Sequence, residues 1–140
     1  MAEAFTSSAT IERPREEVWA TLTDWSKVPA WMQHINSMRA DGPTSAGTQL
    51  WFEARGKERP SMIADLREGE SLTLRSTQGG VTADYHYRLT SLDATTTRLD
   101  LRAECATSGA WSLVGPLLRF MMARSDRGQP EALKQLIEAD

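Results

Sequence analysis

Tyr85, His86 and Tyr87 follow Asp84 directly and form the densest group of proton-transferring side chains in the sequence. An imidazole flanked by phenols and a carboxyl could act as a general base. Residues 81–91, however, alternate between an apolar set that includes both tyrosines and a polar set that includes the histidine. Side chains of a strand point alternately to its two faces. Tyr85 and Tyr87 are therefore predicted to face the interior, and His86 is predicted to face solvent without a catalytic role.

The remaining reactive groups form no catalytic or metal-binding pattern. His34 is expected at the end of a short helix without a partner, and Cys105 shares an apolar face with Leu101, which predicts a buried thiol. Two histidines and one cysteine at wide spacing supply no ligand set, so neither a metal nor another cofactor is expected. Gly79-Gly80, between two predicted strands, indicates a hairpin turn. It is not a phosphate-binding loop, because no helix start follows it. No catalytic residue is assigned.

Composition is typical of one globular domain over residues 1–140, with 40% hydrophobic and 25% charged residues. The net charge of −3 and the lack of a basic run argue against nucleic-acid binding. A single cysteine fits a reducing compartment. The first residues lack the pattern of a signal peptide, in which basic residues precede an apolar run. The most apolar stretch, residues 111–123, is too short to span a bilayer. We expect a cytoplasmic monomer or homodimer without stable membrane insertion.

Turn residues and hydrophobic periodicity predict the order strand, two short helices, six strands and a C-terminal helix. Short loops between successive strands favour an antiparallel meander. A proline after residue 128 is expected to bend or interrupt the last helix, at Gly128-Gln129-Pro130. The expected strands cover residues 5–11, 35–40, 48–55, 60–67, 71–77, 81–91 and 97–107, and the expected helices cover residues 14–23, 29–34 and 109–139.

This order predicts an α+β helix-grip fold. A meander closed on the first strand gives a curved antiparallel seven-stranded β-sheet, and the long C-terminal α-helix has only the concave face of that sheet to pack against. Two short helices lie between strands 1 and 2. Because the sheet curves more than a helix does, we expect a cavity between them.

Several short motifs, in this order, resemble the START-like or SRPBCC superfamily, in particular its polyketide cyclase/dehydrase-like and lipid-transport-like branch. They are Ile11–Pro14 before Glu17-Val18-Trp19, Asp24 before Val28-Pro29-Ala30-Trp31-Met32, Gly47-Thr48, Tyr87-Arg88-Leu89 before Thr97-Arg98-Leu99, and Leu133-Lys134-Gln135-Leu136. The resemblance covers essentially the whole chain and implies a hydrophobic ligand in the cavity. The chain departs from it at Gln33, where many relatives have a second proline, and at residues 128–130, where relatives usually keep the helix continuous.

Strand parity predicts which residues would line such a cavity. Leu50 and Phe52 share one face of their strand, Met62 and Leu74 are expected to continue it, and Met121 is expected on the helix above. The tyrosines would supply the polar contacts that orient a ligand. The predicted ligand-binding residues are Trp31, Leu50, Phe52, Met62, Leu74, Tyr85, Tyr87, Leu101, Leu117 and Met121. The alternative is a solid core in which these side chains leave no space.

The preferred function is binding of a small hydrophobic molecule, aromatic, polyketide-like or lipid-like, between the sheet and the C-terminal helix. Two other functions stay open. One is a cyclase or dehydratase without metal, in which Tyr85, Tyr87 or Arg39 polarises a carbonyl. The other is a protein-interaction module that uses the tryptophans of the two short helices and the strand after them, namely Trp25, Trp31 and Trp51.

Overall fold

The computed structural model describes residues 1–139 and shows a single seven-stranded antiparallel sheet in the order β1-β7-β6-β5-β4-β3-β2. The strands are β1 (Ala2–Ile11), β2 (Ile35–Ala40), β3 (Gln49–Ala54), β4 (Lys57–Arg67), β5 (Ser71–Gln78), β6 (Val81–Asp93) and β7 (Thr96–Thr107). The helices are α1 (Arg15–Leu22), the 3-10 helix η1 (Trp25–Ala30), the 3-10 helix η2 (Gly109–Val114), α2 (Gly115–Asp126) and α3 (Gln129–Glu138). The predicted helix-grip architecture is confirmed.

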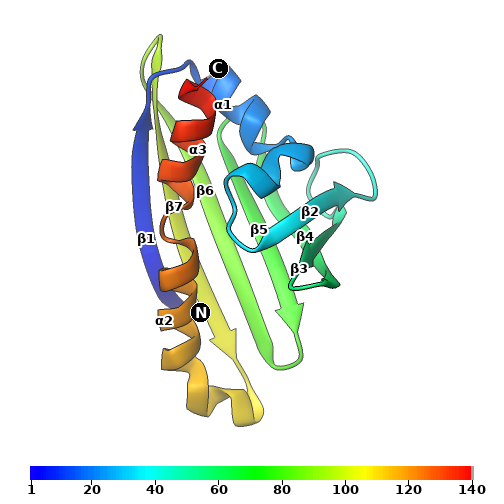
Figure 1. The fold of residues 1–140 in the computed structure, drawn as a ribbon. Coiled ribbons are helices and arrows are strands. Elements are labelled where there is room, and N and C mark those ends of the chain that lie inside the picture. Colours follow the sequence, from blue (N-terminus) through cyan, green and yellow to red (C-terminus); the bar gives the residue numbers. More distant parts are fainter. Residues whose placement is uncertain (140) are drawn as a thin grey trace.

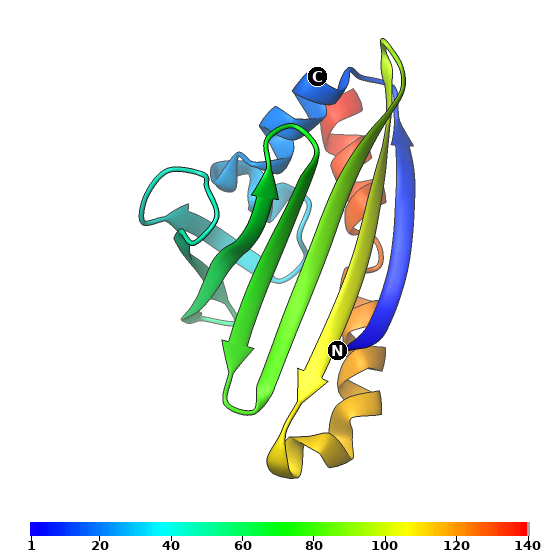
Figure 2. The same cartoon turned by 180° about the vertical axis from the view of Figure 1, so that it is seen from behind.

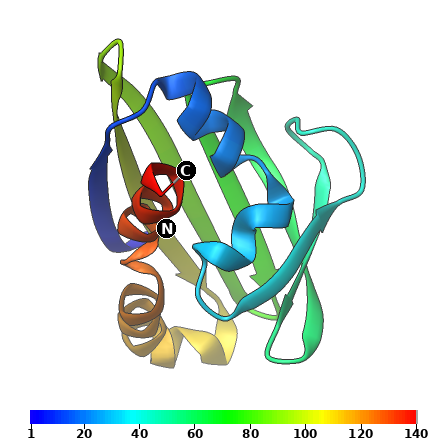
Figure 3. The ribbon, with the colours of Figure 1, turned by 45° about the horizontal axis from the view of Figure 1, so that its top comes forward.

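All helices lie on one side of the curved sheet. In Figure 1, α2 and α3 run along β1 and β7, while α1 and η1 cover the upper end of the sheet. Figure 3 shows the same helices from above, with α2 and α3 on the β1 side of the sheet and α1 and η1 as a separate group toward the other strands. The other face of the sheet carries no helix (Figure 2). The fold therefore has two layers, and the inward face of the sheet is the one that the helices cover.

The two short helices differ from prediction in one respect. α1 begins after Pro14, has Glu16 and Glu17 in its first turn, where the helix dipole favours negative charge, and forms as expected. The second helix was expected over residues 29–34 but covers Trp25–Ala30. Asp24 accounts for the difference, because its carboxylate accepts the backbone N–H of Ser26 at 3.2 Å and caps the earlier start.

The C-terminal helical segment is interrupted where the sequence predicted. α2 ends at Asp126, two residues form a turn, and α3 begins at Gln129. Pro130 lies in the first turn of α3, where a missing backbone N–H leaves no hydrogen bond unmade. The residues on the two sides of this break both reach the sheet, as described below.

Two register shifts change which residues face the helices. One lies between Ile35 and Ser37 of β2, and the other between Ile63 and Asp65 of β4. An extra residue in one strand exchanges the two faces for every side chain beyond it. Parity counted across such a point gives the wrong face.

Met62 is one of the side chains that parity placed wrongly. Its neighbour Ser61 pairs with the fully buried Leu50 and is itself buried, so Ser61 and Ile63 point toward the helices. Met62, between them, points to the other face of the sheet. The prediction that Met62 continues the inward surface is therefore wrong.

Arg39 is the second case. It was expected to share the inward face of Ile35, but its guanidinium lies on the outer surface, 2.7 Å from Asp41 and 3.3 Å from Glu58. It also lies 5.7 Å from the centre of the Trp51 ring. Arg39 is therefore excluded as a group that polarises a ligand in the interior.

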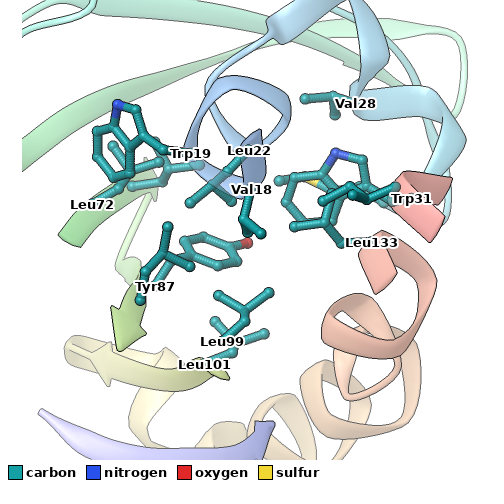
Figure 4. Close-up of a cluster of buried hydrophobic side chains, with 14 of the residues drawn as sticks. Val18, Trp19, Leu22, Val28, Trp31, Leu72, Tyr87, Leu99, Leu101 and Leu133 are labelled. Atoms are coloured by element: carbon teal, nitrogen blue, oxygen red, sulfur yellow. The ribbon is translucent and has the colours of Figure 1, made fainter. Parts of the chain in front are cut away.

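A packed core fills the end of the fold that α1, η1 and α3 cover (Figure 4). Trp31 meets the ring of Tyr87 edge to face, with 5.9 Å between centroids and 85° between planes. Val28 from η1 and Leu133 from α3 are fully buried there, as is Leu99 from β7. At this end the alternative of a solid core is correct.

Leu133 should carry a large part of the packing between α3 and the sheet. It is 0% exposed, so Leu133→Ala is expected to lower the free energy of unfolding by about 2–5 kcal/mol in urea titrations. Leu92→Ala is the matched control, because Leu92 is 53% exposed and its truncation should change stability by less than about 0.5 kcal/mol. Equal effects of the two substitutions would contradict the packing described here.

Candidate functional site

A cavity of about 370 Å³ opens between β2–β6, the turn after η1 and the break between α2 and α3. This volume falls within the range of small-molecule sites. Apolar side chains from three elements form much of its wall, and polar groups gather where the helix break meets the sheet. The lining comprises Met32, Gln33, His34, Ile35, Met38, Phe52, Ala54, Arg55, Arg59, Ser61, Leu74, Ser76, Gln78, Ala83, Tyr85, Tyr87, Ser125, Asp126 and Gln129.

Four of the predicted ligand-binding residues come together in this lining: Phe52, Leu74, Tyr85 and Tyr87. They come from β3, β5 and β6 and all belong to the inward face of the sheet. The alternation of β6 therefore placed both tyrosines on the correct face. Their role in binding stays a prediction.

Three others lie in the core beside the cavity and do not line it. Trp31, Leu50 and Leu101 are 2%, 0% and 1% exposed and pack among other buried side chains. They hold the walls in place, so a contact with a ligand would require the core to rearrange. Met62, on the opposite face of the sheet, is also outside the lining.

The two residues expected above the cavity point away from it. Leu117 is 56% exposed and Met121 is 48% exposed, both on the outward face of α2. Met122 and Ala123 pack against the core instead. The prediction that Leu117 and Met121 cover the cavity is therefore wrong by about a quarter turn of helix, or one residue.

The polar end of the cavity is built from the two sheet tyrosines and the two residues that flank the helix break. The Tyr85 hydroxyl donates a hydrogen bond to the Asp126 carboxylate, and the Tyr87 hydroxyl donates to Gln129 Oε1 at 2.5 Å. Ser125 also donates to Asp126, at 3.1 Å. Each phenol thus ties one side of the break to β6.

Burial governs the protonation of this pair. Burial raises the pKa of the Asp126 carboxyl above its ordinary 3.8, and the hydrogen bonds from Tyr85 and Ser125 offset only part of that rise. Burial, together with the charge of Asp126, raises the pKa of Tyr85. The phenol therefore stays neutral and donates, whereas the carboxyl can accept a hydrogen bond or exchange a proton nearer to neutral pH.

Two further polar residues line the cavity that the sequence did not indicate. Arg59 pairs with Phe52 across the β3–β4 hairpin, and its guanidinium donates to Gln78 Oε1 at 2.8 Å. His34 adopts a left-handed backbone with φ of 67°, and its charge favours the ionised form of Asp126. An arginine thus lines the interior, at a position other than Arg39.

A pattern in the sequence could have identified some of these groups. Asp126 is the first carboxylate after Glu104 and follows the apolar part of α2. A lone acidic residue at the end of an apolar helix indicates a specific partner. Arg59 required the hairpin register, which the sequence specifies only once the turn at residues 55–56 is located.

His86 and Cys105 lie where the sequence placed them. His86 is on the helix-free face, with Thr73 Oγ1 2.9 Å from Nδ1 and Glu104 Oε1 2.7 Å from Nε2. Cys105 is 1% exposed, and burial raises the pKa of its thiol, which makes it a poor nucleophile. Neither residue lines the cavity.

Comparison with known families shows what the chain resembles. A family model described as "Polyketide cyclase / dehydrase and lipid transport" matches residues 2–138. Among curated proteins, no sequence match was found.

Solved structures share the fold at low sequence identity. A START superfamily protein from Mycobacterium smegmatis is 12% identical with a TM-score of 0.77, covering 96% of this chain and 97% of that one. The Zhui aromatase/cyclase from Streptomyces sp. R1128 is 16% identical with a TM-score of 0.75, and the match covers 96% of this chain and 92% of that one. The di-domain ARO/CYC BexL from the BE-7585A biosynthetic pathway is 15% identical with a TM-score of 0.79, covering 99% and 47%.

The raised pKa of Asp126 predicts a stability difference that depends on pH. A carboxyl whose pKa rises on folding stabilises the fold when protonated, so its contribution is complete below about pH 4 and is lost as pH rises through the folded-state pKa. Asp126→Asn removes that titration. We expect the variant to gain stability over the parent protein as pH rises from 4 to about 7, measured by urea unfolding at a series of pH values.

Asp93→Asn is the control with the opposite sign. A backbone N–H of Thr95 lowers the pKa of the Asp93 carboxyl, so this substitution should cost stability at neutral pH and little in acid. A pH-independent difference for Asp126→Asn, or a parent protein that is more stable than this variant at pH 7, would contradict the assignment.

Proposed function

Because the chain belongs to the polyketide cyclase/dehydrase and lipid transport family, we propose that it binds a small hydrophobic molecule in the cavity beside the break between α2 and α3. The observation that carries this proposal is the Tyr85–Asp126 hydrogen bond set into a largely apolar wall. Such a pair orients a ligand that the apolar wall holds. The single, buried Cys105 favours action in a reducing compartment such as the cytoplasm.

The size of the cavity allows useful affinity. Burying about 300 Å² of apolar ligand surface contributes roughly 7 kcal/mol at about 25 cal/mol per Å². The loss of translational and rotational freedom of the ligand costs several kcal/mol of this free energy, which leaves a dissociation constant in the micromolar range. No chemical step is needed to explain the cavity.

The polar end specifies the class of ligand. Asp126 accepts hydrogen bonds, the Tyr85 oxygen can accept one while its proton is donated to Asp126, and Arg59 adds a cation in the same wall. A flat apolar body with a hydroxyl group at one end fits this arrangement, because the hydroxyl can donate to Asp126 while the rings contact Phe52 and Leu74. Aromatic and polyketide-like phenols belong to this class, and so do lipids that end in a hydroxyl group.

A pair of probes that differ in one polar group tests this proposal. 2-Naphthol should bind the protein more tightly than 2-methylnaphthalene, measured by ligand fluorescence or calorimetry. Asp126→Leu should weaken the binding of 2-naphthol about tenfold, because one hydrogen bond to the carboxyl group is lost. The affinity for 2-methylnaphthalene should stay nearly unchanged. Leu74→Trp should weaken the binding of both probes, because the larger side chain fills the cavity.

Leu92→Trp is the matched control, since it adds the same side chain at an exposed position on β6. Circular dichroism confirms that each variant is folded before affinities are compared. Binding of both probes that survives Leu74→Trp would place the ligand elsewhere and overturn the proposal. If Asp126→Leu lowers the affinity for both probes equally, the polar end of the cavity does not orient the ligand.

A cyclase or dehydratase is the second candidate, favoured by the same pair of side chains. Tyr85 remains a neutral donor that can polarise a carbonyl if its proton turns from Asp126 to the ligand, and burial raises the pKa of Asp126 above its ordinary value. In a dehydration, Asp126 would take a proton from the carbon beside the carbonyl. It would then return this proton to the β-hydroxyl, which leaves as water.

3-Hydroxy-1-tetralone tests this chemistry, because loss of water converts it into 1-naphthol, which fluoresces. If the protein is a dehydratase, Tyr85→Phe should lower turnover about a hundredfold while binding of 2-methylnaphthalene is retained. Tyr87→Phe is the comparison, because its hydroxyl is paired to Gln129 rather than to Asp126. Turnover that is absent in the parent protein, or unchanged in Tyr85→Phe, would leave binding alone as the function.

A further inference from the structure

One end of the molecule exposes a cluster of large apolar side chains that the cavity does not use. Of the eight large hydrophobic residues exposed in the described chain, six lie within residues 111–121. η2 buries none of its side chains. Figures 1 and 2 show η2 and the start of α2 at one end of the molecule, beyond the end of β7. We call this surface the η2–α2 patch; it consists of Trp111, Leu113, Val114, Leu117, Phe120 and Met121.

The patch is continuous along α2. Phe120 and Met121 lie three and four residues after Leu117, and Arg124 lies four and three residues after them, which places all four on one face of the helix. The opposite face packs against β1 and β7. Phe120, the central residue of this outward face, is 61% exposed. A helix that already buries one face and still exposes an apolar one indicates a second contact.

The charged side chains of the patch segment itself have a single sign. Residues 108–125 contain no aspartate or glutamate, although the chain has 19 acidic residues and a net charge of −3. Arg124 and Arg127 are exposed at the end of α2, and neither makes an ion pair within the part of the chain that the structure describes. The patch therefore presents apolar side chains and then unpaired cations.

We propose that the η2–α2 patch docks the protein on the surface of an anionic lipid bilayer. Trp111, Leu117 and Phe120 would enter the boundary between headgroups and acyl chains, where aromatic and aliphatic side chains are favoured. Arg124 and Arg127 would contact lipid phosphates. The contact is peripheral, since among the described residues no helix is long and apolar enough to cross a membrane.

A second copy of the chain fits this surface less well than an anionic bilayer. In a two-fold dimer the same patch meets itself, so every charge that residues 108–125 of either copy bring to the contact is positive. No carboxylate within residues 108–125 could neutralise these charges. An anionic bilayer supplies that negative charge over an extended surface.

The position of the patch gives the contact a consequence for the cavity. α2 has 12 residues and is about 18 Å long, and its last residue, Asp126, lines the cavity. Docking through α2 would bring the helix break close to the bilayer surface. A ligand could then pass between bilayer and cavity without crossing much water. This consequence rests on the proposed function, whereas the docking itself does not.

Vesicle co-sedimentation measures the docking directly. We expect the full chain to sediment with vesicles of phosphatidylcholine and phosphatidylglycerol but weakly with vesicles of phosphatidylcholine alone. Leu117→Ser with Phe120→Ser should reduce binding at least tenfold, through loss of buried apolar area. Arg124→Glu with Arg127→Glu should also reduce binding at least tenfold and abolish the preference for the anionic lipid.

Two control variants separate the patch from other parts of the molecule. Leu92→Ser removes a similarly exposed leucine at the end of β6, outside the η2–α2 patch, and should leave vesicle binding unchanged. Leu74→Trp fills the cavity and should also leave vesicle binding unchanged, which distinguishes failure of the docking from failure of ligand uptake. All of the patch substitutions replace exposed side chains, so circular dichroism should show the parent fold.

Three results would overturn the docking proposal. The first is absence of binding to the anionic vesicles, and the second is equal binding of the parent protein to both kinds of vesicle. The third is a stable dimer in light scattering that Phe120→Ser dissociates, without binding to vesicles, which would assign the patch to a second copy. Equal losses in Leu92→Ser and in the patch variants would show that no specific surface is involved.

Discussion

Two hydrogen bonds between β6 and the break in the C-terminal helical segment hold the two C-terminal helices against the sheet. Tyr85 donates to Asp126 and Tyr87 donates to Gln129, one on each side of the break. A continuous helix would place residues 126 and 129 one above the other on a single straight axis. The two-residue turn lets α2 and α3 take separate positions on the sheet. The cavity lies beside this junction, so the sheet tyrosines fix both the helix position and the polar end of the space.

The same face of the sheet is solid at one end and hollow at the other. At the α1 end, Val28, Leu133 and Leu99 are fully buried, and their close packing stabilises the fold. Toward β3 and β4 the inward positions include Ser61 and Arg59, which cannot pack in the same way. A buried carboxyl with a raised pKa at the edge of that hollow costs stability at neutral pH, and proteins concentrate such costs at functional sites. The distribution of polar groups therefore separates the structural half of the interior from the candidate site.

The sequence predicted the fold well because periodicity and turn residues are local signals. It placed all seven strands, the first short helix and the interruption near Pro130, and the alternation of residues 81–91 in β6 oriented both tyrosines; the second short helix was expected but begins four residues earlier than predicted. Parity failed where a strand contains an extra residue: the register shifts in β2 and β4 turned Arg39 and Met62 to the outer face. Helix phase failed for Leu117 and Met121, because apolar residues occur on both faces of α2 and the sequence cannot tell which of them the sheet covers. Asp126 was missed because its partner is 41 residues away, on β6.

Four positions of α2 are the reverse of what stability alone would select, although Met122 and Ala123 pack against the core. A helix on the surface of a globular protein normally turns polar side chains to water and apolar ones to the core. In α2 the outward face carries Leu117 and Phe120, while Ser125 and Asp126 point inward to the cavity. Each of these placements opposes folding: apolar area remains in water, and a carboxyl is buried. The proposed bilayer contact on the outer side and the proposed ligand group on the inner side would make both placements favourable. Under these two proposals α2 is the element that joins the cavity to the docking surface.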